Sequence, residues 1–362
     1  MKVCVALGMA NFASQTTITS ALQVSDDPNA ASRKLDHIEL AFRSQVNSGE
    51  LDARFYYEPM LAAHPESGSL PITPFLGKEL RAPIWVSSMT GGTEKALVIN
   101  QNLARACAEF GLGMGLGSCR SLLYADDRRC DFDMRPLIGP NQPLFANLGL
   151  AQVEILLADN EVFRIDRLIE MLDVDGLIVH VNPFQEWLQP EGDRFQHPPI
   201  DTLASLLTAY PDLPIIVKEV GQGMGSASLR ALFQLPLAAI DTAASGGTNF
   251  SKLELLRGNL AAQEAYLPLA AIGHSAEQMT DFINEILVDP SADIQCRQLI
   301  ISGGVRNFLD GYYLTERVQL PAIYGQASPF LRHAQGDYSE LRDFVSGQIR
   351  GLELARAFLS LR

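Results

Sequence analysis

A cluster of polar side chains follows a strongly apolar run in the middle of the sequence. His180, Asn182, Gln185 and Glu186 come directly after the run GLIV at 176–179. On a strand, His180 and Asn182 would point to the same side, and Gln185 and Glu186 would lie on the loop beyond it. A carboxylate there suits Mg²⁺ that also binds substrate phosphates. A lone histidine in a strand is more often a core residue, but four polar groups at one strand end favour a site.

Lys218 ends a second apolar run, PIIVK at 214–218, and Glu219 follows it. An ammonium group at a buried strand end is costly unless an anion lies near it. Two kinds of partner are open. One is a structural ion pair with Glu219 or Asp241, and the other is an electron-rich cofactor ring, such as the N1/O2 edge of a reduced flavin.

Small residues follow two apolar runs nearer the C-terminal end. SGGVR spans residues 302–306 and QAS spans residues 326–328. The backbone N–H groups of such loops commonly bind phosphate in barrel enzymes. A Gly-Gly pair alone is more often a turn, but two small-residue loops on successive strands favour a cofactor phosphate.

These polar groups end apolar, β-branched runs that alternate with segments of helical periodicity. The alternation predicts a parallel sheet, and eight units over about 245 residues predict an α/β fold of the closed (β/α)8 TIM barrel type. An open doubly wound sheet is the alternative. We also expect a decorated loop over the barrel mouth at 238–297 and a C-terminal helix at 338–361 that closes the barrel. The predicted strands are 83–89, 112–119, 144–150, 176–182, 214–221, 237–245, 299–305 and 321–328.

The domain organisation follows from this pattern. Residues 1–32 are rich in Ser, Thr, Ala and Gln without a strong period, which predicts a flexible N-terminal arm. Residues 33–362 are expected to form a single barrel domain.

Composition excludes several classes of function. Of 362 residues, 47% are hydrophobic and 19% charged, which is typical of a folded globular chain and not of a disordered one. The net charge of −14 disfavours nucleic acid or a membrane surface as a partner. A small anionic ligand would need a local group of cations, and Arg33, Lys34, His37 and Arg120 are the candidates.

The sequence also bears on location. The five cysteines include no CxxC pair, so neither a disulfide framework nor a zinc site is indicated, and a reducing compartment fits best. The first residues have one positive charge and no clear cleavage site, unlike a signal peptide. No apolar run approaches the ~18 residues of a membrane-spanning helix. We therefore expect a cytoplasmic protein with no membrane partner.

The motifs together resemble the type 2, FMN-dependent isopentenyl diphosphate delta-isomerases, in order and spacing, over about residues 33–335. The HVNPFQE, KEVG and GGTNFSK segments are specific to that family, whereas MTGG and SGGVR are more widespread among flavin-binding barrels. The matching segments are RKLDHI (33–38), SSMTGG (87–92), GLGSCR (115–120), FANLG (145–149), HVNPFQE (180–186), PEGDRF (190–195), IVKEVGQGM (216–224), SGGTNFSKLELLR (245–257) and SGGVR (302–306).

The resemblance implies an isomerase of isoprenoid biosynthesis. Such an enzyme interconverts isopentenyl and dimethylallyl diphosphate by a 1,3-allylic proton shift, with reduced FMN as acid and base, Mg²⁺ on the diphosphate and NADPH as the reductant of FMN. A homo-oligomer, tetramer or octamer, is also implied. By matching position, FMN would be held by Met89, Thr90, Gly91, Ser118, Asn147, Lys218, Thr248, Gly303, Arg306, Ala327 and Ser328.

The remaining implied roles concern the substrate. Glu186 would bind Mg²⁺, and His180, Gln185 and Lys218 would be catalytic, although the acceptor of the second proton stays open between the flavin and Gln185 with water. The implied substrate-binding residues are Arg33, Lys34, His37, Ser118, Arg120, Asn182 and Gln185.

Two other functions compete. An FMN-dependent 2-hydroxy acid oxidase or dehydrogenase would share the barrel and the flavin, but it needs a histidine base beside the last strands, where His274 and His333 are poorly positioned. A flavin-binding module that has lost catalysis is the other, because the segment after SGGVR, NFLDGYYL, departs from the family.

Overall fold

The computed structural model describes residues 30–362, and these fall into two compact units. The first unit extends to Asp52 and contains helix α1 (Ala30–Leu40) and the 3-10 turn η1 (Ser48–Glu50). The second unit, Ala53–Arg362, contains all other elements. Most of the arm predicted at 1–32 lies outside the described residues, so the division at residue 32 stays a prediction.

Eight parallel strands close into a barrel, which confirms the predicted fold. The strand order is β4-β5-β6-β7-β8-β9-β10-β11, and β11 pairs with β4 through Tyr324 and Ile84. This last pairing excludes the open-sheet alternative. The strands are β4 (Ile84–Val86), β5 (Gly113–Gly115), β6 (Leu144–Gly149), β7 (Gly176–His180), β8 (Ile215–Lys218), β9 (Ala239–Asp241), β10 (Leu299–Ser302) and β11 (Ala322–Gln326).

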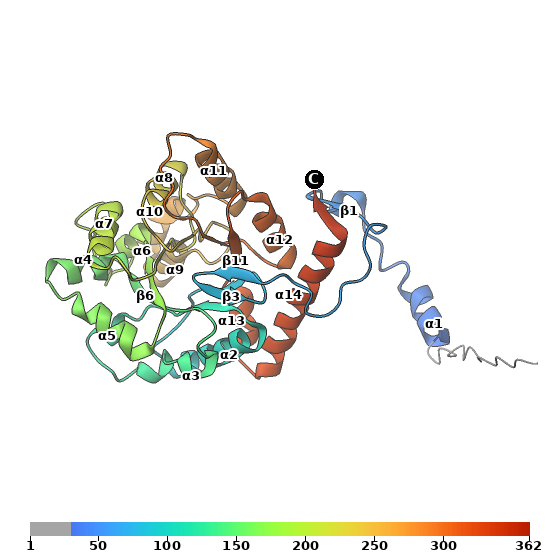
Figure 1. Cartoon of the computed structure of the whole chain (residues 1–362), viewed down its shortest axis with the longest axis horizontal. Coiled ribbons are helices and arrows are strands. Elements are labelled where there is room, and N and C mark those ends of the chain that lie inside the picture. Colours follow the sequence, from blue (N-terminus) through green and yellow to red (C-terminus); the bar gives the residue numbers. More distant parts are fainter. Residues whose placement is uncertain (1–29) are drawn as a thin grey trace, which may run out of the picture. The chain divides into compact units, whose positions relative to one another are not determined.

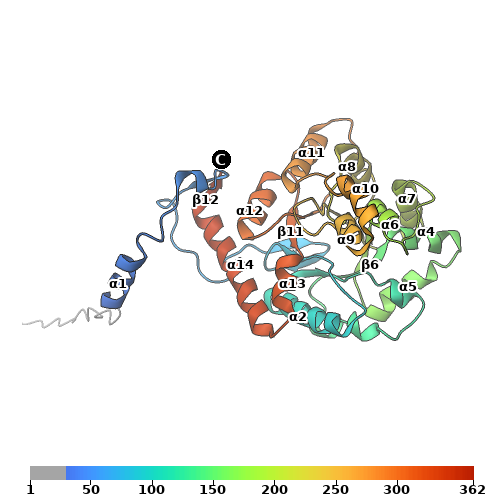
Figure 2. The same ribbon diagram turned by 180° about the vertical axis from the view of Figure 1, so that it is seen from behind.

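Helices surround the barrel and connect its strands (Figure 1, Figure 2). The expected decoration between β9 and β10 consists of α9, α10 and α11. None of the helices in residues 30–362 combines the length and the apolar character needed to cross a bilayer. The helices of the second unit are α2 (Glu94–Phe110), α3 (Arg135–Ile138), α4 (Leu150–Ala158), α5 (Phe163–Leu172), α6 (Pro183–Leu188), α7 (Pro199–Ala209), α8 (Ser226–Phe233), α9 (Phe250–Arg257), α10 (Leu260–Ala270), α11 (Ala276–Val288), α12 (Phe308–Arg317), α13 (Ser328–Ala334) and α14 (Tyr338–Phe358), with 3-10 turns η2 (Arg120–Leu123) and η3 (Arg129–Asp131).

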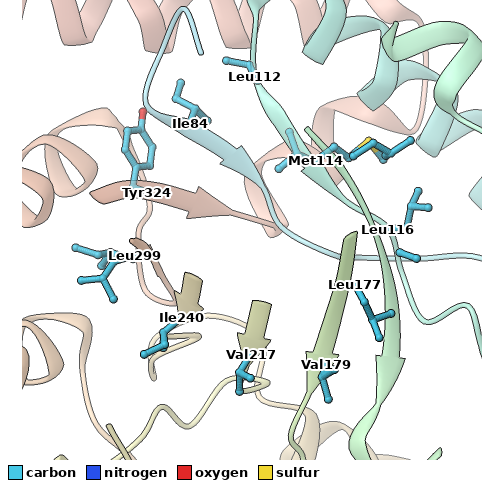
Figure 3. Close-up of a cluster of buried hydrophobic side chains, with 14 of the residues drawn as sticks. Ile84, Leu112, Met114, Leu116, Leu177, Val179, Val217, Ile240, Leu299 and Tyr324 are labelled. Carbon is cyan, nitrogen blue, oxygen red and sulfur yellow. The ribbon is translucent and has the colours of Figure 1, made fainter. Parts of the chain in front are cut away.

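The larger core lies on the outer face of the strands. Ile84, Val217, Ile240 and Leu299 come from four different strands and are fully buried. Figure 3 shows their side chains pointing away from the centre of the ring of strands. Because side chains alternate along a strand, the neighbouring residues point into the barrel.

A second core fills the barrel interior. Trp85, Phe145 and Ile178 point inward and pack with Phe75 and Leu80 of a hairpin outside the barrel sheet. The rings of Phe75 and Phe145 both contact the Trp85 ring edge-on, with centroids 6.2 and 6.0 Å away. The interior is thus filled by side chains at one end, which leaves the carboxyl ends of the strands for a ligand.

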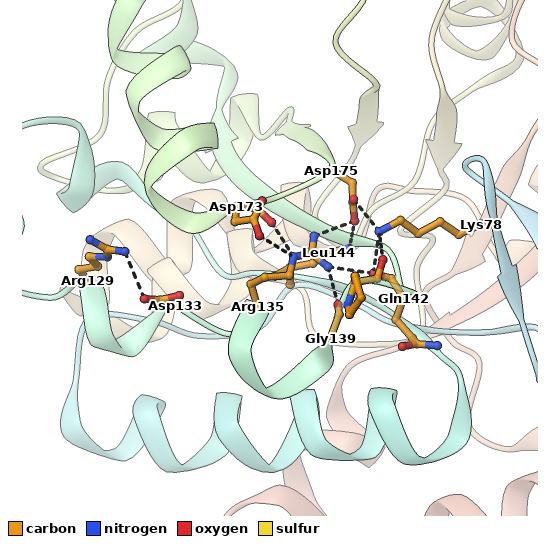
Figure 4. Close-up of polar contacts among 10 residues, drawn as sticks. Lys78, Arg129, Asp133, Arg135, Gly139, Gln142, Leu144, Asp173 and Asp175 are labelled. Carbon is orange, nitrogen blue, oxygen red and sulfur yellow. Dashed lines mark hydrogen bonds and ion pairs between the residues drawn. The ribbon is translucent and has the colours of Figure 1, made fainter.

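The hairpin, β2 (Thr73–Phe75) with β3 (Lys78–Leu80), is fixed across the amino ends of the strands by ion pairs (Figure 4). Lys78 lies 2.6 Å and Arg135 2.9 Å from the carboxylate of Asp175, which also accepts the Leu144 N–H at 2.8 Å. Burial raises the pKa of Asp175, but these hydrogen bonds outweigh burial and hold the pKa below its usual value.

The predicted C-terminal helix is confirmed, but it is shorter than predicted. Helix α14 ends at Phe358, and β12 (Leu359–Leu361) pairs antiparallel with β1 (Phe55–Tyr57). Leu359 and Leu361 alternate with Ser360, which is the period of a strand and not of a helix. The ring of strands closes by the β11–β4 pairing, and α14 packs on α2, which follows β4, and on α13, which follows β11.

Candidate active site

The carboxyl ends of four neighbouring strands form the floor of the barrel mouth. His180, Lys218 and Asp241 are in register on β7, β8 and β9, and Ser302 ends β10. Each stands two residues beyond an inward apolar residue of its own strand, so all four side chains point inward. The floor therefore carries an imidazole, an ammonium, a carboxylate and a hydroxyl.

A cavity of about 590 Å³ opens above this floor. Lys218 and Ser302 line it from below, and the loops after β4, β8, β9, β10 and β11 form its walls. Its size is ordinary for a small-molecule site, roughly 300–1,000 Å³. Six of the eleven predicted cofactor residues line it, namely Lys218, Thr248, Gly303, Arg306, Ala327 and Ser328.

The other five predicted cofactor residues do not line this cavity. Residues 89–91 continue the loop after β4, whose first residues, Ser87 and Ser88, do line it. Ser118 is exposed on the loop after β5, and Asn147 is buried on β6. The predicted cofactor residues that line the cavity thus come from β8 to β11 and the loops after them. The five that do not line it lie on β6 or follow β4 and β5.

The cavity has features that fit a flavin. The buried atoms Ser87 Oγ, Ser88 Oγ and Gln326 Oε1 have no hydrogen-bond partner, and all three residues line the cavity. Gly303 has φ +85°, and a β-carbon there would lie 2.0 Å from the Ala244 carbonyl oxygen, so only glycine fits this loop. A polar ring system beside the unpartnered atoms and a phosphate beside the glycine loop would satisfy both features.

The segment after SGGVR forms an ordinary helix despite its unusual sequence. Asn307 caps α12 by accepting N–H groups from Leu309 and Asp310. Asp310 accepts the backbone N–H of Arg306 at 3.0 Å and pairs with its guanidinium at 3.0 Å. Burial raises the pKa of Asp310, but its hydrogen bonds with Arg306 and Arg54 keep the pKa low. The Arg306 backbone is therefore fixed at the cavity wall.

Arg332 is a cavity residue that the sequence did not single out. It lies on α13, close in sequence to Ser328, and its side chain is exposed at the cavity. Within residues 30–362 its guanidinium makes no hydrogen bond or ion pair. Gly246 and Gly247 also line the cavity beyond the predicted set. The PFLR segment after the QAS loop was the only available signal, because a cation one helical turn beyond a phosphate loop can reach it.

His180 is held as a neutral imidazole. Its Nδ1 lies 2.7 Å from Asn147 Oδ1. Because an amide oxygen only accepts, Nδ1 carries the proton and Nε2 keeps its lone pair. Withdrawal of the ring from bulk water, with the Lys218 ammonium nearby, lowers the pKa of His180 to about 4. At neutral pH His180 can accept a hydrogen bond or a proton through Nε2.

Three members of the predicted cluster after β7, Asn182, Gln185 and Glu186, contact one another, but Gln185 and Glu186 lie on helix α6 and not on a loop as predicted, because Pro183 starts a helix directly after Asn182. Asn182 is buried before α6, and its Nδ2 donates to Gln185 Oε1 at 3.0 Å and to Glu186 Oε1 at 3.1 Å. Glu186 is 7% exposed, and its Oε2 accepts the Asp193 N–H at 2.8 Å. No group of three metal-binding side chains occurs in the described chain. Glu186 fits a Mg²⁺ site only as a single carboxylate, with phosphate and water as the other ligands.

Arg120 is tied to the same loop by an ion pair. Its Nη1 lies 2.8 Å from Asp193 Oδ2, which also accepts a hydrogen bond from Gln152 Nε2 at 2.8 Å. Asp193 thus connects the predicted substrate cation to Glu186 through its side chain and its backbone. Asp193 could not be predicted from the sequence, because its role depends on contacts with Gln152 on α4 and with Arg120 after β5.

Buried carboxylates hold the loops of the mouth by accepting backbone N–H groups. Glu219 Oε2 accepts three of them, from residues 221–223. Burial nevertheless raises the pKa of Glu219. Glu154 on α4 accepts the N–H groups of Gln196 and His197 on the loop after α6. Each carboxylate replaces the secondary-structure partners that these loops lack.

Three predicted substrate residues belong to the first unit. Arg33, Lys34 and His37 lie on α1 and are exposed, with His37 in its last turn. Their positions within α1 are known from the structure, and their roles toward a substrate stay predictions.

The chain is similar to curated proteins over nearly its whole length. It is 35% identical over 327 residues to an isopentenyl-diphosphate delta-isomerase of Nostoc sp., covering 89% of each chain. It is 33% identical to the protein of that name from Rickettsia felis, covering 89% of this chain and 90% of the relative. The corresponding protein of Ignicoccus hospitalis is 31% identical, with 90% and 88% covered. No family model matches the chain.

Solved structures support the fold. Mandelate oxidase with (S)-2-phenylpropionate superimposes with a TM-score of 0.52 at 14% identity, covering 86% of each chain. A mandelate oxidase mutant with (S)-mandelic acid gives a TM-score of 0.52 at 13% identity, covering 85% of this chain and 86% of the other. At such identities the likeness concerns the barrel architecture alone.

Proposed function

Because the chain belongs to the isopentenyl-diphosphate delta-isomerase family, we propose that it interconverts isopentenyl and dimethylallyl diphosphate with reduced FMN and Mg²⁺. One observation carries the proposal. The metal-competent Glu186 and its amide neighbours stand at the end of β7, and Lys218 at the end of the adjoining β8 lines a cavity that fits a flavin. Phosphate recognition and flavin chemistry would therefore meet at neighbouring strands.

The reaction moves a proton along an allylic unit without net oxidation. The hydrocarbon part of the substrate offers no hydrogen-bonding group, so the protein can position it only by shape and through its diphosphate. Reduced FMN, when bound, would supply the acid and base that exchange protons with the substrate carbons. Lys218 would hold its ammonium against the electron-rich edge of that cofactor.

The diphosphate would be bound by the Arg120 and Glu186 region. Arg120 supplies a guanidinium that Asp193 holds in place, and guanidinium pairs well with phosphate oxygens. Glu186 would hold Mg²⁺ against the same phosphates. Ser118, Arg33, Lys34 and His37 are proposed to donate hydrogen bonds to the substrate, in line with the family resemblance. Asn182, whose Nδ2 already donates to Gln185 and Glu186, is proposed to hold these two side chains toward the substrate.

His180 and Gln185 are proposed to assist at the reacting carbons. His180 presents an unprotonated Nε2, so it can orient a donor or accept a proton, but it cannot deliver one at neutral pH. Gln185 is fixed by its hydrogen bond from Asn182 and is suited to orient a water molecule. We further propose NADPH as the reductant, a cytoplasmic location and a homo-oligomer.

The direct test uses purified protein with FMN, a reductant, Mg²⁺ and isopentenyl diphosphate. Formation of dimethylallyl diphosphate, followed by ¹H NMR in D₂O, is expected together with deuterium exchange at the allylic positions. Absence of product with fully bound, reduced FMN would refute the proposal. Glu186→Gln is expected to lower turnover at least 100-fold while the flavin spectrum persists. Product from wild type and not from this variant would also exclude a module without catalysis.

The 2-hydroxy acid oxidase alternative finds no support in the site. No histidine lines the 590 Å³ cavity. His274 packs edge-on against Phe282 at 5.4 Å, and His333 stacks on Phe344 at 4.5 Å. The histidine on the floor of the mouth, His180, ends β7 and not one of the last strands, so the protein is expected not to reduce its FMN when mixed anaerobically with mandelate or lactate.

A further inference from the structure

We propose that Asp241, a carboxylate beneath the cavity floor, sets the reduction potential of the bound flavin by acting through Lys218. The inference rests on the proposed function, since it requires FMN in the cavity above Lys218. Asp241 does not line that cavity, so it is a positioning residue and not a catalytic one.

Asp241 is completely buried, and one of its oxygens is left without a hydrogen bond. Oδ1 accepts hydrogen bonds from Ser302 Oγ and from the Ala243 N–H at 3.3 Å. Oδ2 has no hydrogen-bond partner, although the Lys218 Nζ lies 3.9 Å away. Burying a carboxylate with an unpaired oxygen costs folding free energy unless a nearby cation offsets its charge.

The separation of 3.9 Å distinguishes this pair from a structural salt bridge. It is beyond hydrogen-bond length, and the hydrogen bond of the Lys218 ammonium goes instead to the Glu219 carbonyl oxygen at 2.9 Å. Lys218 also lines the cavity, so a bound anion could contact its ammonium there. Asp241 affects it mainly through charge, which acts strongly in a water-poor interior.

The other charged groups near Lys218 do not take over this role. Glu219 directs its Oε2 to the backbone N–H groups of its own loop, and His180 is neutral. Asp241 is thus the carboxylate that faces the ammonium from the adjacent strand and offsets its charge. The positive charge of Lys218 would favour the anionic reduced flavin. The negative charge of Asp241 weakens this effect and therefore lowers the reduction potential of the flavin.

The test is the midpoint potential of bound FMN in Asp241→Asn, measured anaerobically against a reference dye. Loss of the negative charge is expected to favour the reduced flavin about tenfold or more, which equals an upward shift of about 30 mV for a two-electron couple. In a Lys218→Met background the same substitution should shift the potential much less. Glu353→Gln is the matched control, because Glu353 is buried on α14 and is not among the cavity-lining residues.

Asp241→Ser provides a second neutral variant with a smaller side chain, and the same upward shift is expected. An unchanged or lower potential in a variant that binds FMN would overturn the inference, as would an equal shift with and without Lys218. Failure of both variants to fold would assign Asp241 a structural role and also overturn it. If wild type itself does not bind FMN, the proposed function fails instead, so the two failures are distinguishable.

Discussion

Protonation of His180 should destabilise the folded barrel at mildly acidic pH. An exposed histidine titrates near 6.5, whereas His180 titrates at about 4 because its ring is withdrawn from water and lies near Lys218. The difference between these values corresponds to at most about 3 kcal/mol. This energy is an upper value because His180 is only partly buried.

The sign follows from proton binding in the two states. Between pH 6.5 and about pH 4 the unfolded chain carries a proton on His180 and the folded chain does not. The unfolded state binds more protons, so stability rises with pH across this window. The contribution is fully present above pH 6.5, and it is lost as the pH falls to about 4.

Two measurements check this prediction. Urea unfolding of wild type and His180→Gln between pH 4 and 8 should show a stability difference that grows with pH by up to about 3 kcal/mol. In ¹³C-histidine NMR, the resonance missing from His180→Gln should stay constant in wild type from pH 8 to pH 5. The His180 signal moving with a midpoint between pH 6 and 7 would refute the reasoning, as would a stability difference independent of pH.

Further predictions concern the cavity and the hairpin. Arg332→Ala is expected to weaken FMN binding about tenfold or more and to leave riboflavin binding unchanged, because riboflavin lacks the phosphate. Fluorescence titration with both ligands measures this, and equal losses would argue against a phosphate contact. Gly303→Ala places a β-carbon 2.0 Å from the Ala244 oxygen at φ +85°, so we expect FMN binding to be abolished and stability to fall by about 1–3 kcal/mol. Near-normal FMN binding by this variant would contradict a phosphate site at the Gly303 loop. Asp175→Asn should cost about 2 kcal/mol in urea unfolding, because Lys78 and Arg135 lose their shared carboxylate. Asp133→Asn, at the more exposed pair with Arg129, should cost under about 0.5 kcal/mol, and equal losses would refute the role of the hairpin anchor.

The fold was predictable because each barrel strand has a local signal. Buried parallel strands are continuous apolar runs, and all eight predicted runs contain a strand of the barrel. The last residues, 359–361, were misassigned because they directly follow a long helical pattern, and their pairing with β1 is a long-range contact. The hairpin β2–β3 was missed for a similar reason. Its inward residues acquire their role only when the barrel closes around them.

The candidate site divides in the same way. The group at Asn182, Gln185 and Glu186 was predictable because its members are close in sequence and their contacts are local. Asp193 and Arg332 were not, since their importance depends on loops from different strands. For Lys218 the sequence left open a structural partner or a cofactor. In the structure Asp241 lies 3.9 Å from its ammonium, beyond hydrogen-bond length, and the role of Lys218 toward a cofactor stays a prediction.

The carboxylates that hold the mouth loops limit how this scaffold could be redesigned. Glu219 holds the loop in which it lies, so that segment could be transplanted to another barrel as a self-sufficient piece. The loop around Gln196 and His197 differs, because its acceptor, Glu154, belongs to helix α4, which is separated from the loop by α5, β7 and α6. Exchanging that loop without α4 would leave the buried Glu154 carboxylate without its hydrogen-bond donors. Transfer of the loop around Gln196 and His197 to a related barrel should therefore succeed when α4 is transferred with it. It should fail when the loop is moved alone.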